Sequence, residues 1–277
     1  MTRSITEPAP AKINLALHVT GQRGDGYHLL DSLVVFTALG DRITIAPGAL
    51  SLTVTGPFGP AVPPGDDNLC LRAARAVDAE AAILLKKTLP PASGIGGGTA
   101  DAAAVLRALG RVPDQPQMLG ADLPACLLSR PLRMQGVGEV LTPLSLPDLH
   151  LLLVNPRVEL PTPQVFAALT RRDNPGLPDL PHVSDAAALT DWLRGTRNDL
   201  QAAALTLAPV IGDCLAALDG AGAALSRMSG SGATCFGIFP DAAAAQAAAA
   251  RIGSMQPGWW VRATETISGL PVRRARG

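Results

Sequence analysis

The stretch best suited to chemistry is residues 93–101, where four glycines fall within five positions ahead of the strong helix formers of 102–109. Glycine backbone carries no side chain beyond hydrogen, so its N–H groups can approach a ligand closely. The unpaired N–H groups and partial positive charge of a helix start attract phosphate oxygens. This pattern predicts a nucleotide-phosphate site. The alternative is a flexible glycine turn before an ordinary helix.

Two common phosphate-binding motifs do not fit this stretch. A P-loop needs a lysine directly after its last glycine, and here Thr99 follows Gly98. The dinucleotide pattern G-x-G-x-x-G fails at its last position, both at 94–99 and at a second glycine loop over 230–235. A Rossmann-type oxidoreductase is therefore disfavoured.

Two ionisable residues outside this stretch, Lys12 and Asp122, are further candidates for chemistry. Apolar residues alternate with polar ones over 13–19, which predicts a strand with Lys12 and Asn14 on its polar face. Asp122 precedes a short helix, where a carboxylate can act as a general base or simply cap the helix. A lysine on such a face can stabilise negative charge that develops nearby. A solvated lysine on a strand is the alternative.

Composition limits the class of protein. The 277 residues are 47% hydrophobic and carry 23 basic and 23 acidic side chains, so bulk attraction to nucleic acid or an anionic membrane is not expected. The four cysteines and four histidines show no metal-ligand spacing, and the metal ligands stay unknown. No signal peptide or membrane-length apolar run is seen, so we expect a cytoplasmic protein. No protein partner is indicated.

The elements that must position these residues mix strands and helices in two halves, which predicts an α+β fold. Prolines around 145–148 suggest domains of 1–147 and 148–277. Further strands are predicted at 33–39, 42–45, 50–54, 82–88, 134–141, 150–154, 225–229, 234–239 and 259–264. Further helices are predicted at 69–79, 125–129, 162–170, 185–194, 198–207, 210–218 and 241–252.

Three segments in order resemble the motifs of the GHMP kinase superfamily, namely 10–15, 96–103 and 228–233. Within it the chain is similar to the branch that uses ATP to phosphorylate the 2-hydroxyl of a cytidine diphosphate-linked methylerythritol, in the non-mevalonate isoprenoid pathway. The signatures that indicate this branch span most of the chain: Asp25–His28, Asp67–Leu69, Leu119–Pro124, Gly136–Glu139 and Pro161–Pro163.

The resemblance implies a two-domain GHMP kinase fold. Its N-terminal domain is ribosomal-protein-S5-like, its C-terminal domain is ferredoxin-like, and ATP, Mg²⁺ and the small-molecule substrate meet in the cleft between them. Backbone, helix dipole and magnesium then carry the phosphate charge that a P-loop lysine carries elsewhere.

The resemblance also assigns ATP-binding residues. Asn68 and Lys87 map near the ATP base or ribose, and Gly230, Ser231 and Gly232 close over the phosphate loop, with a plain interdomain turn as the alternative. The loop that wraps the phosphates consists of Pro90, Pro91, Ala92, Ser93, Gly94, Ile95, Gly96, Gly97, Gly98, Thr99 and Ala100.

The remaining assignments concern catalysis and the substrate. Lys12 and Asp122 match the catalytic pair, and Asn14 is a substrate contact. Tyr27 and His28 resemble the cytidine-recognition pair, since an aromatic face suits stacking and an imidazole can hydrogen-bond to a base edge. Thr162 and Phe166 join the substrate site, Phe166 as a second wall of the stack. Core packing is the alternative for Tyr27 and Phe166, and a surface histidine is the alternative for His28.

Two departures from the family pattern stand out. Thr99 and Ala100 replace two serines, and segments 68–87 and 109–120 are short, which affects the expected base pocket. The other hypotheses are a mevalonate- or homoserine-type GHMP kinase and a non-catalytic nucleotide-binding relative. Tyr27–His28 disfavours the first, and retention of both Lys12 and Asp122 disfavours the second.

Overall fold

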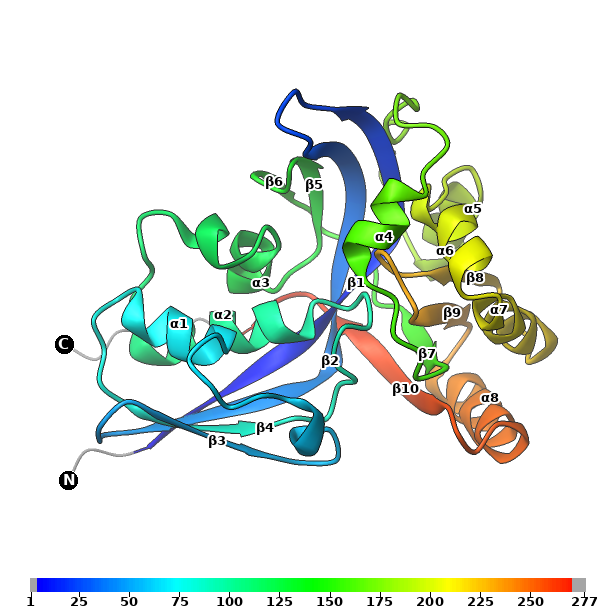
Figure 1. The fold of residues 1–277 in the computed structure, drawn as a ribbon. Helices are drawn as coiled ribbons and strands as arrows, with labels where there is room; N and C mark the ends of the chain where they lie inside the picture. The colour runs from blue at the N-terminus through cyan, green and yellow to red at the C-terminus, as the bar shows by residue number, and fades with distance from the viewer. Residues whose placement is uncertain (1–3, 271–277) are drawn as a thin grey trace.

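A long antiparallel hairpin runs through the whole molecule. The computed structural model describes residues 4–270, and in it β1 (Ile5–Gln22) pairs along its length with β2 (His28–Ala46) (Figure 1). The strand predicted over 13–19 is confirmed and is longer at both ends. β2 is continuous where two strands were predicted, because Gly40 has no side chain to strike the adjacent carbonyl of Ala9.

β2 is the hub of a sheet that has ten strands among the described residues. It pairs with β1, β4, β5 and β10, and the longest path through the sheet is β3-β4-β2-β10-β7-β9-β8. β10 therefore joins the two halves of the chain. The other strands are β3 (Ser51–Thr55), β4 (Ala82–Lys86), β5 (Leu132–Gly136), β6 (Val140–Pro143), β7 (His150–Asn155), β8 (Leu225–Met228), β9 (Cys235–Phe239) and β10 (Trp260–Ile267).

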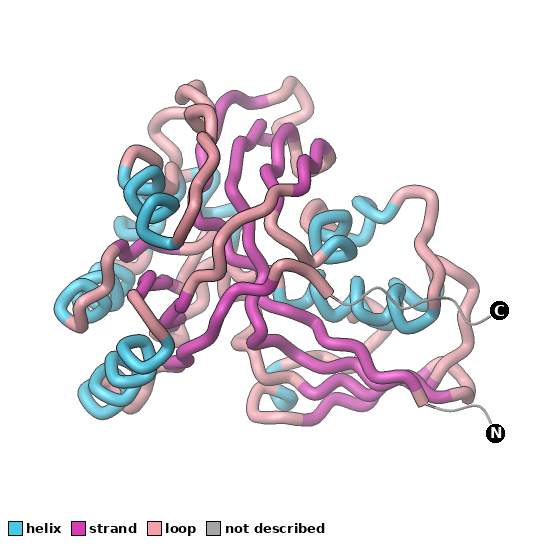
Figure 2. Tube along the Cα trace, turned by 180° about the vertical axis from the view of Figure 1, so that it is seen from behind, coloured by secondary structure: helices cyan, strands magenta, loops and turns pink. Residues whose placement is uncertain are grey.

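The helices form two groups on either side of the long hairpin, as Figure 2 also shows from behind. The first group is α1 (Leu69–Arg75), α2 (Gly97–Leu109) and α3 (Leu123–Leu128), and the second is α5 (Ala186–Arg194), α6 (Leu200–Leu207), α7 (Val210–Gly220) and α8 (Ala242–Met255). The short α4 (Thr162–Ala167) packs against α6 of the second group, on the side that faces the first group. Within residues 4–270 no single helix is long and apolar enough to cross a membrane, although α6 and α7, bent by 116°, pass that test as a pair.

Several elements differ from their predicted bounds, and three of these differences have a clear physical reason or change the element itself. α2 begins at Gly97 and so includes glycines predicted as loop, because its next turns are packed into the core and outweigh the low helix propensity of glycine. α1 ends at Arg75, four residues early. The strand predicted over 134–141 is two strands, since Gly136 and Gly138 adopt φ of +71° and +109° and turn the chain between β5 and β6.

Three hydrophobic clusters hold the sheet and the helices together. One lies under α2 in the N-terminal half, and a second lies under α7 and α8 in the C-terminal half. The third combines Ile13 and Leu33 of the hairpin with Leu151 of β7 and Leu193 of α5. The mixed α+β class is confirmed. The 147/148 boundary, which stays a prediction, falls between β6 and β7 while this third cluster and the sheet continue across it.

Candidate active site

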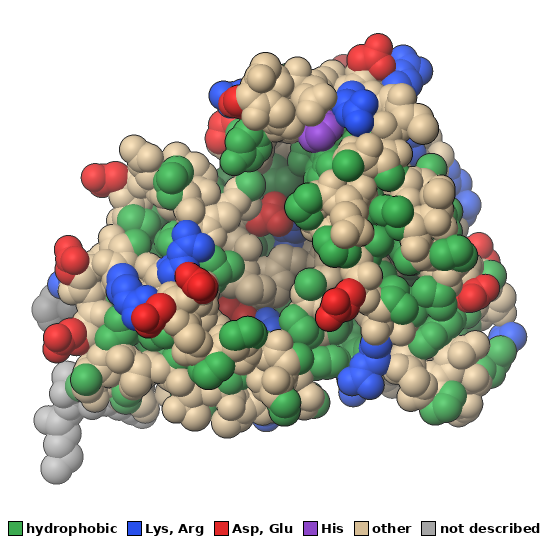
Figure 3. Space-filling model, viewed as in Figure 1, with side chains coloured by type: hydrophobic (Ala, Val, Ile, Leu, Met, Phe, Trp, Pro, Cys, Tyr) green, Lys and Arg blue, Asp and Glu red, His purple; other side chains and the backbone are tan. Residues whose placement is uncertain are grey.

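A cleft of about 900 Å³ opens between the two groups of helices, and Figure 3 shows the hollow. Its walls come from β1 and β2, from the glycine loop and the start of α2, from the start of α3, from α4 and from the second glycine loop. Segments far apart in the sequence therefore meet there. This is the geometry of a small-molecule site, which is concave and carries a few polar groups among apolar ones.

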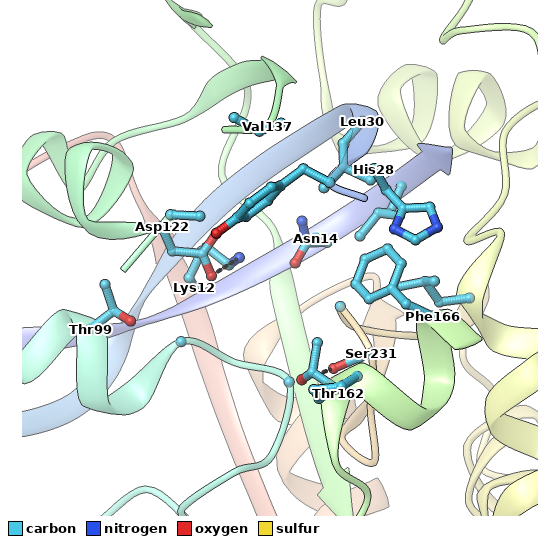
Figure 4. A pocket seen from close by; sticks show the side chains of 18 of the residues that line it. Lys12, Asn14, His28, Leu30, Thr99, Asp122, Val137, Thr162, Phe166 and Ser231 are labelled. Atoms are coloured by element: carbon cyan, nitrogen blue, oxygen red, sulfur yellow. Dashed lines mark hydrogen bonds and ion pairs between the residues drawn. The ribbon is translucent and has the colours of Figure 1, made fainter. Parts of the chain in front are cut away.

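Lys12 and Asp122 form an ion pair in this cleft. Lys12 Nζ lies 2.7 Å from Asp122 Oδ2, with the two side chains 6% and 30% exposed, and Figure 4 marks the contact. Asp122 occupies the N-cap position of α3, yet its side chain makes no capping hydrogen bond. The capping alternative thus accounts for the position of Asp122 but not for the use of its carboxylate, which faces the lysine.

Irregularities in β1 aim its polar side chains at the cleft. The register against β2 shifts between Pro10 and Lys12 and again between Asn14 and Ala16, so Lys12 and Asn14 lie between two bulges. The backbone N–H of Lys12 donates to Ile95 O in the glycine loop at 2.9 Å instead of to the sheet. The bulges therefore fix both side chains beside that loop.

Asn14 presents an unsatisfied acceptor. Its Nδ2 donates to Ser32 Oγ at 2.8 Å and its backbone N–H donates to Ser229 Oγ at 3.1 Å. Oδ1 is buried and accepts no hydrogen bond from the described residues. Because Asn14 lines the cleft, this oxygen can accept a hydrogen bond from a ligand hydroxyl.

The two glycine loops are packed and hydrogen-bonded together. Thr234 N donates to Ser93 O at 3.1 Å, and Ser229 Oγ donates to Gly94 O at 3.1 Å. Gly94 has φ of +75°, and a Cβ there would lie 2.5 Å from Ser229 O, so only glycine fits. The second loop thereby holds the first at the start of α2, whose first residues line the cleft and carry the unpaired N–H groups of a helix start.

The predicted ATP-binding residues divide into two sets. Ile95 and Ala100 are buried in the core, and Asn68 caps α1 by accepting from Cys70 N at 2.9 Å. Pro90, Pro91 and Lys87 also lie outside the lining. The residues that do line the cleft are Ala92, Ser93, Gly94, Gly96, Gly97, Gly98 and Thr99.

Lys87 lies beneath the loop rather than at the cleft. Its side chain is 2% exposed, and Nζ lies 2.6 Å from Asp41 Oδ2 and 2.6 Å from Asp101 Oδ2. Asp41 Oδ1 also accepts from the backbone N–H groups of Thr88 and Leu89 at 2.5 and 2.8 Å. The triad Asp41–Lys87–Asp101 therefore ties the start of the glycine loop to the first turns of α2.

An aromatic group forms another part of the cleft wall. The rings of His28 and Phe166 stack with centroids 4.6 Å apart and planes 29° from parallel, while Tyr27 is 64% exposed. Figure 4 shows Phe166 beneath His28. In the structure the ring next to Phe166 is His28, and the stacking of a cytosine on Tyr27 and Phe166 stays a prediction. Burial, helped by the positive charge of Arg172, lowers the pKa of His28, so the imidazole is neutral at pH 7.

Hydroxyl groups link α4 to the second glycine loop. Thr162 Oγ1 and Ser231 Oγ are 2.7 Å apart, and both residues line the cleft with Gly230. Gly232 does not line it. Sequence reasoning missed several lining residues, including Asp25, Val137 and Arg172. Asp25 and Val137 lie inside the quoted signatures, which could have indicated them, whereas one arginine of a pair at 171–172 carries no such signal.

Among the described residues no group of three His, Cys, Asp or Glu side chains could hold a metal ion. Mg²⁺ is commonly held by one or two carboxylates, water and substrate phosphates rather than by an all-protein cage. The Thr99 hydroxyl at the start of α2 is a lining oxygen that such an ion could use. The donor set thus fits a magnesium ion that arrives with a nucleotide.

Comparisons with known proteins match both halves of the chain. The model "GHMP kinases N terminal domain" matches residues 68–128, and "GHMP kinases C terminal" matches residues 178–257. A 4-diphosphocytidyl-2-C-methyl-D-erythritol kinase from Paracoccus denitrificans (strain Pd 1222) is 65% identical over 260 residues, which is 93% of this chain and 95% of that relative.

Two solved structures extend the comparison. A crystal structure of 4-(cytidine 5'-diphospho)-2C-methyl-D-erythritol kinase has a TM-score of 0.79 at 33% identity, over 96% of this chain and 100% of that one. A homoserine kinase from Cytophaga hutchinsonii has a TM-score of 0.63 at 17% identity, over 97% and 96%. The second likeness concerns the fold alone.

Proposed function

The chain belongs to the GHMP kinase family, and within it to the 4-diphosphocytidyl-2-C-methyl-D-erythritol kinases, and from this we propose how its cleft works. The enzyme is an ATP-dependent small-molecule kinase. Its reaction transfers the γ-phosphoryl group of ATP to the 2-hydroxyl of 4-diphosphocytidyl-2-C-methyl-D-erythritol in the non-mevalonate isoprenoid pathway. The roles proposed for the residues rest on one observation: the Lys12–Asp122 pair, the glycine loop and the His28–Phe166 stack all line the same cleft. The cytoplasmic location remains a prediction from the sequence.

The glycine loop and the start of α2 hold the phosphates of ATP in this proposal. Backbone N–H groups at Gly96, Gly97 and Gly98 line the cleft, and the helix end adds partial positive charge. Magnesium, when bound, would neutralise charge that builds up on the transferred phosphoryl group. Thr99 replaces the first of two serines and keeps a hydroxyl for this region, whereas Ala100 is buried and takes no part.

Asp122 receives the proton of the substrate hydroxyl. Its Oδ2 is held by Lys12, while Oδ1 accepts no hydrogen bond from the residues that the structure describes, so Oδ1 can accept one from the hydroxyl. As the hydroxyl oxygen bonds to the γ-phosphorus, its proton passes to Asp122 and the bond from phosphorus to the β–γ bridging oxygen breaks, releasing ADP. Lys12 stabilises the negative charge near the reacting oxygens.

The aromatic group binds the cytosine end of the substrate. Phe166 offers an apolar ring face, and Tyr27 stands exposed at the rim of the cleft, where a ligand can cover it. His28 Nε2 is buried and has no partner among the described residues, which suits a hydrogen bond to a base edge once the ring turns. Asn14 Oδ1 then accepts from a hydroxyl of the methylerythritol part.

A substrate comparison tests this proposal. Purified protein is assayed for ADP release with ATP, Mg²⁺ and one acceptor at a time: 4-diphosphocytidyl-2-C-methyl-D-erythritol, mevalonate or homoserine. We expect turnover with the cytidine-linked acceptor at least 100-fold above the other two in kcat/KM. Comparable rates with mevalonate or homoserine would favour the other GHMP kinase hypothesis. ATP binding without transfer to any acceptor would favour the non-catalytic one.

A further inference from the structure

Arg172 is a cation in the cleft that has no acidic partner among the described residues. Four charged residues line the cleft, and three of them are paired: Lys12 with Asp122, and Asp25 with Arg23 at 2.8 Å. Arg172 forms no ion pair with any described residue. A positive charge left unpaired in a cleft favours an anionic ligand, since removing it from water without a counter-charge is costly.

The guanidinium group of Arg172 also has N–H donors that are not used by the described residues. Nη2 donates to Ala167 O at 3.5 Å, which is at the limit of a hydrogen bond. Nε is buried and has no acceptor among residues 4–270. An arginine presents five N–H donors in a planar fork that matches phosphate oxygens, so most of these donors are available to a ligand.

The loop that carries Arg172 is fixed to the long hairpin. Two residues further on, Asn174 donates to Val19 O of β1 from both its backbone N–H and its side chain, each at 3.1 Å. Leu177 N donates to the buried Asp31 of β2 at 2.9 Å. Because the backbone is held on the sheet, little ordering of the loop is needed when a ligand binds, which favours affinity.

Arg172 acts in the part of the cleft that holds the aromatic group. The positive charge of Arg172 helps to lower the pKa of the His28 imidazole. The hydrogen bond from Arg172 to O of Ala167, the residue that follows Phe166 in α4, places the arginine near Phe166. A neutral His28 does not compete with Arg172 for an anion. The cation is thus positioned beside the proposed nucleotide end of the substrate.

We propose that Arg172 binds the diphosphate of the cytidine-linked substrate and so distinguishes this substrate from alcohols that lack a nucleotide. The inference rests on the proposed function. In it Arg172 is a substrate-binding residue that takes no part in proton transfer and does not contact ATP. A charge-assisted or bidentate contact of this kind is worth about 10- to 100-fold in affinity.

Binding measurements with a series of ligands test this role. The dissociation constants of cytidine, CMP and CDP are measured by calorimetry for wild type, Arg172→Gln and Arg172→Lys. We expect Arg172→Gln to raise the dissociation constant of CDP by about 10- to 100-fold and that of cytidine by less than about 3-fold, with an intermediate increase for CMP. Arg172→Lys retains the charge and recovers part of the loss for CDP. Retained cytidine binding shows that the variants are folded.

Arg171→Gln is the matched control. Arg171 is the neighbouring arginine, its side chain is 63% exposed, and it is paired with Asp173. This variant is expected to bind CDP as wild type does. In steady-state assays Arg172→Gln raises the KM for the cytidine-linked substrate and leaves the KM for ATP within about 2-fold.

Three results would overturn the inference. Unchanged CDP affinity in Arg172→Gln would show that the guanidinium does not reach the diphosphate. Equal losses for cytidine and CDP would show that Arg172 contacts the base instead. If the wild-type protein binds neither cytidine nor CDP, the proposed function itself fails and the inference falls with it, whereas in the first two cases the proposed function stands.

Discussion

Replacing Lys87 by methionine removes the cation of a buried triad. Lys87 is 2% exposed, and its ammonium lies 2.6 Å from carboxylate oxygens of both Asp41 and Asp101, whose side chains are 0% and 4% exposed. Methionine is similar in length and apolar, so the cavity left behind is small. The main effect of Lys87→Met is to leave two buried carboxyl groups without a counter-charge.

The size of this effect follows from the burial. Breaking a buried ion pair by removing one partner costs about 3–5 kcal/mol of unfolding free energy. Asp41 keeps the backbone donors of Thr88 and Leu89, and Asp101 can become protonated, which argues against a larger loss. For a chain of this size each kcal/mol corresponds to about 2–4 °C, so the melting temperature is expected to fall by about 6–20 °C.

Urea denaturation followed by circular dichroism measures this difference. Lys86→Met is the matched control, since Lys86 is the adjacent residue of β4 and its side chain is exposed. The control is expected to change the unfolding free energy by less than about 0.5 kcal/mol. A loss below about 1 kcal/mol for Lys87→Met, or an equal loss in the control, would refute the account of Lys87 as the anchor of the glycine loop.

Three further predictions concern the loop, the triad and the aromatic group. Gly94→Ala is expected to raise the KM for ATP more than 10-fold, because the new Cβ would strike Ser229 O. In the control Gly98→Ala the new Cβ would lie 3.6 Å from Leu69 Cδ1, which is an ordinary contact. Equal KM values for ATP in the two variants would contradict this prediction. Burial raises the pKa of Asp101 above its unfolded value, against the opposing effect of Lys87, so the folded state holds that proton more tightly and this contribution to stability is lost as pH rises. The unfolding free energy of wild type relative to Asp101→Asn should therefore fall as the pH rises above the ordinary pKa of an aspartic acid, and a constant difference in urea titrations would count against it. Phe166→Ala is expected to raise the KM for the cytidine-linked substrate more than 10-fold and the KM for ATP less than 3-fold in steady-state assays, and equal changes would mean that the base binds elsewhere.

The local pattern of the sequence was enough to predict the polar face of β1. Alternation placed Lys12 and Asn14 on one side of a strand, and the structure brings both to the cleft. The contact between Lys12 and Asp122 spans 110 residues, which no periodicity reveals. It was expected from the ordered family motifs, and the geometry that makes it possible depends on two bulges in β1 that the sequence did not indicate.

Other features depended on contacts that only the folded chain contains. A lysine at the end of a strand is usually solvated, and Lys87 is buried only because Asp41 and Asp101 arrive from β2 and α2 to neutralise it. Similarly, the glycines of 97–98 were predicted as loop because glycine has a weak helix propensity. In the structure they are helical, because the packing of the rest of α2 outweighs that propensity. The place of Arg172 follows from the hydrogen bonds of residues 174–177 to the hairpin.

The most direct test of the central claim follows the transferred phosphorus itself. Wild-type protein is incubated with ATP, Mg²⁺ and 4-diphosphocytidyl-2-C-methyl-D-erythritol, and the products are examined by ³¹P NMR. The account predicts a new phosphomonoester resonance on the 2-oxygen of the acceptor, in step with formation of ADP. It also predicts that this resonance is absent or at least 1,000-fold slower to appear with Asp122→Asn, whose ATP binding is retained. Wild-type rates in Asp122→Asn, or ADP formed without the new phosphomonoester, would contradict it.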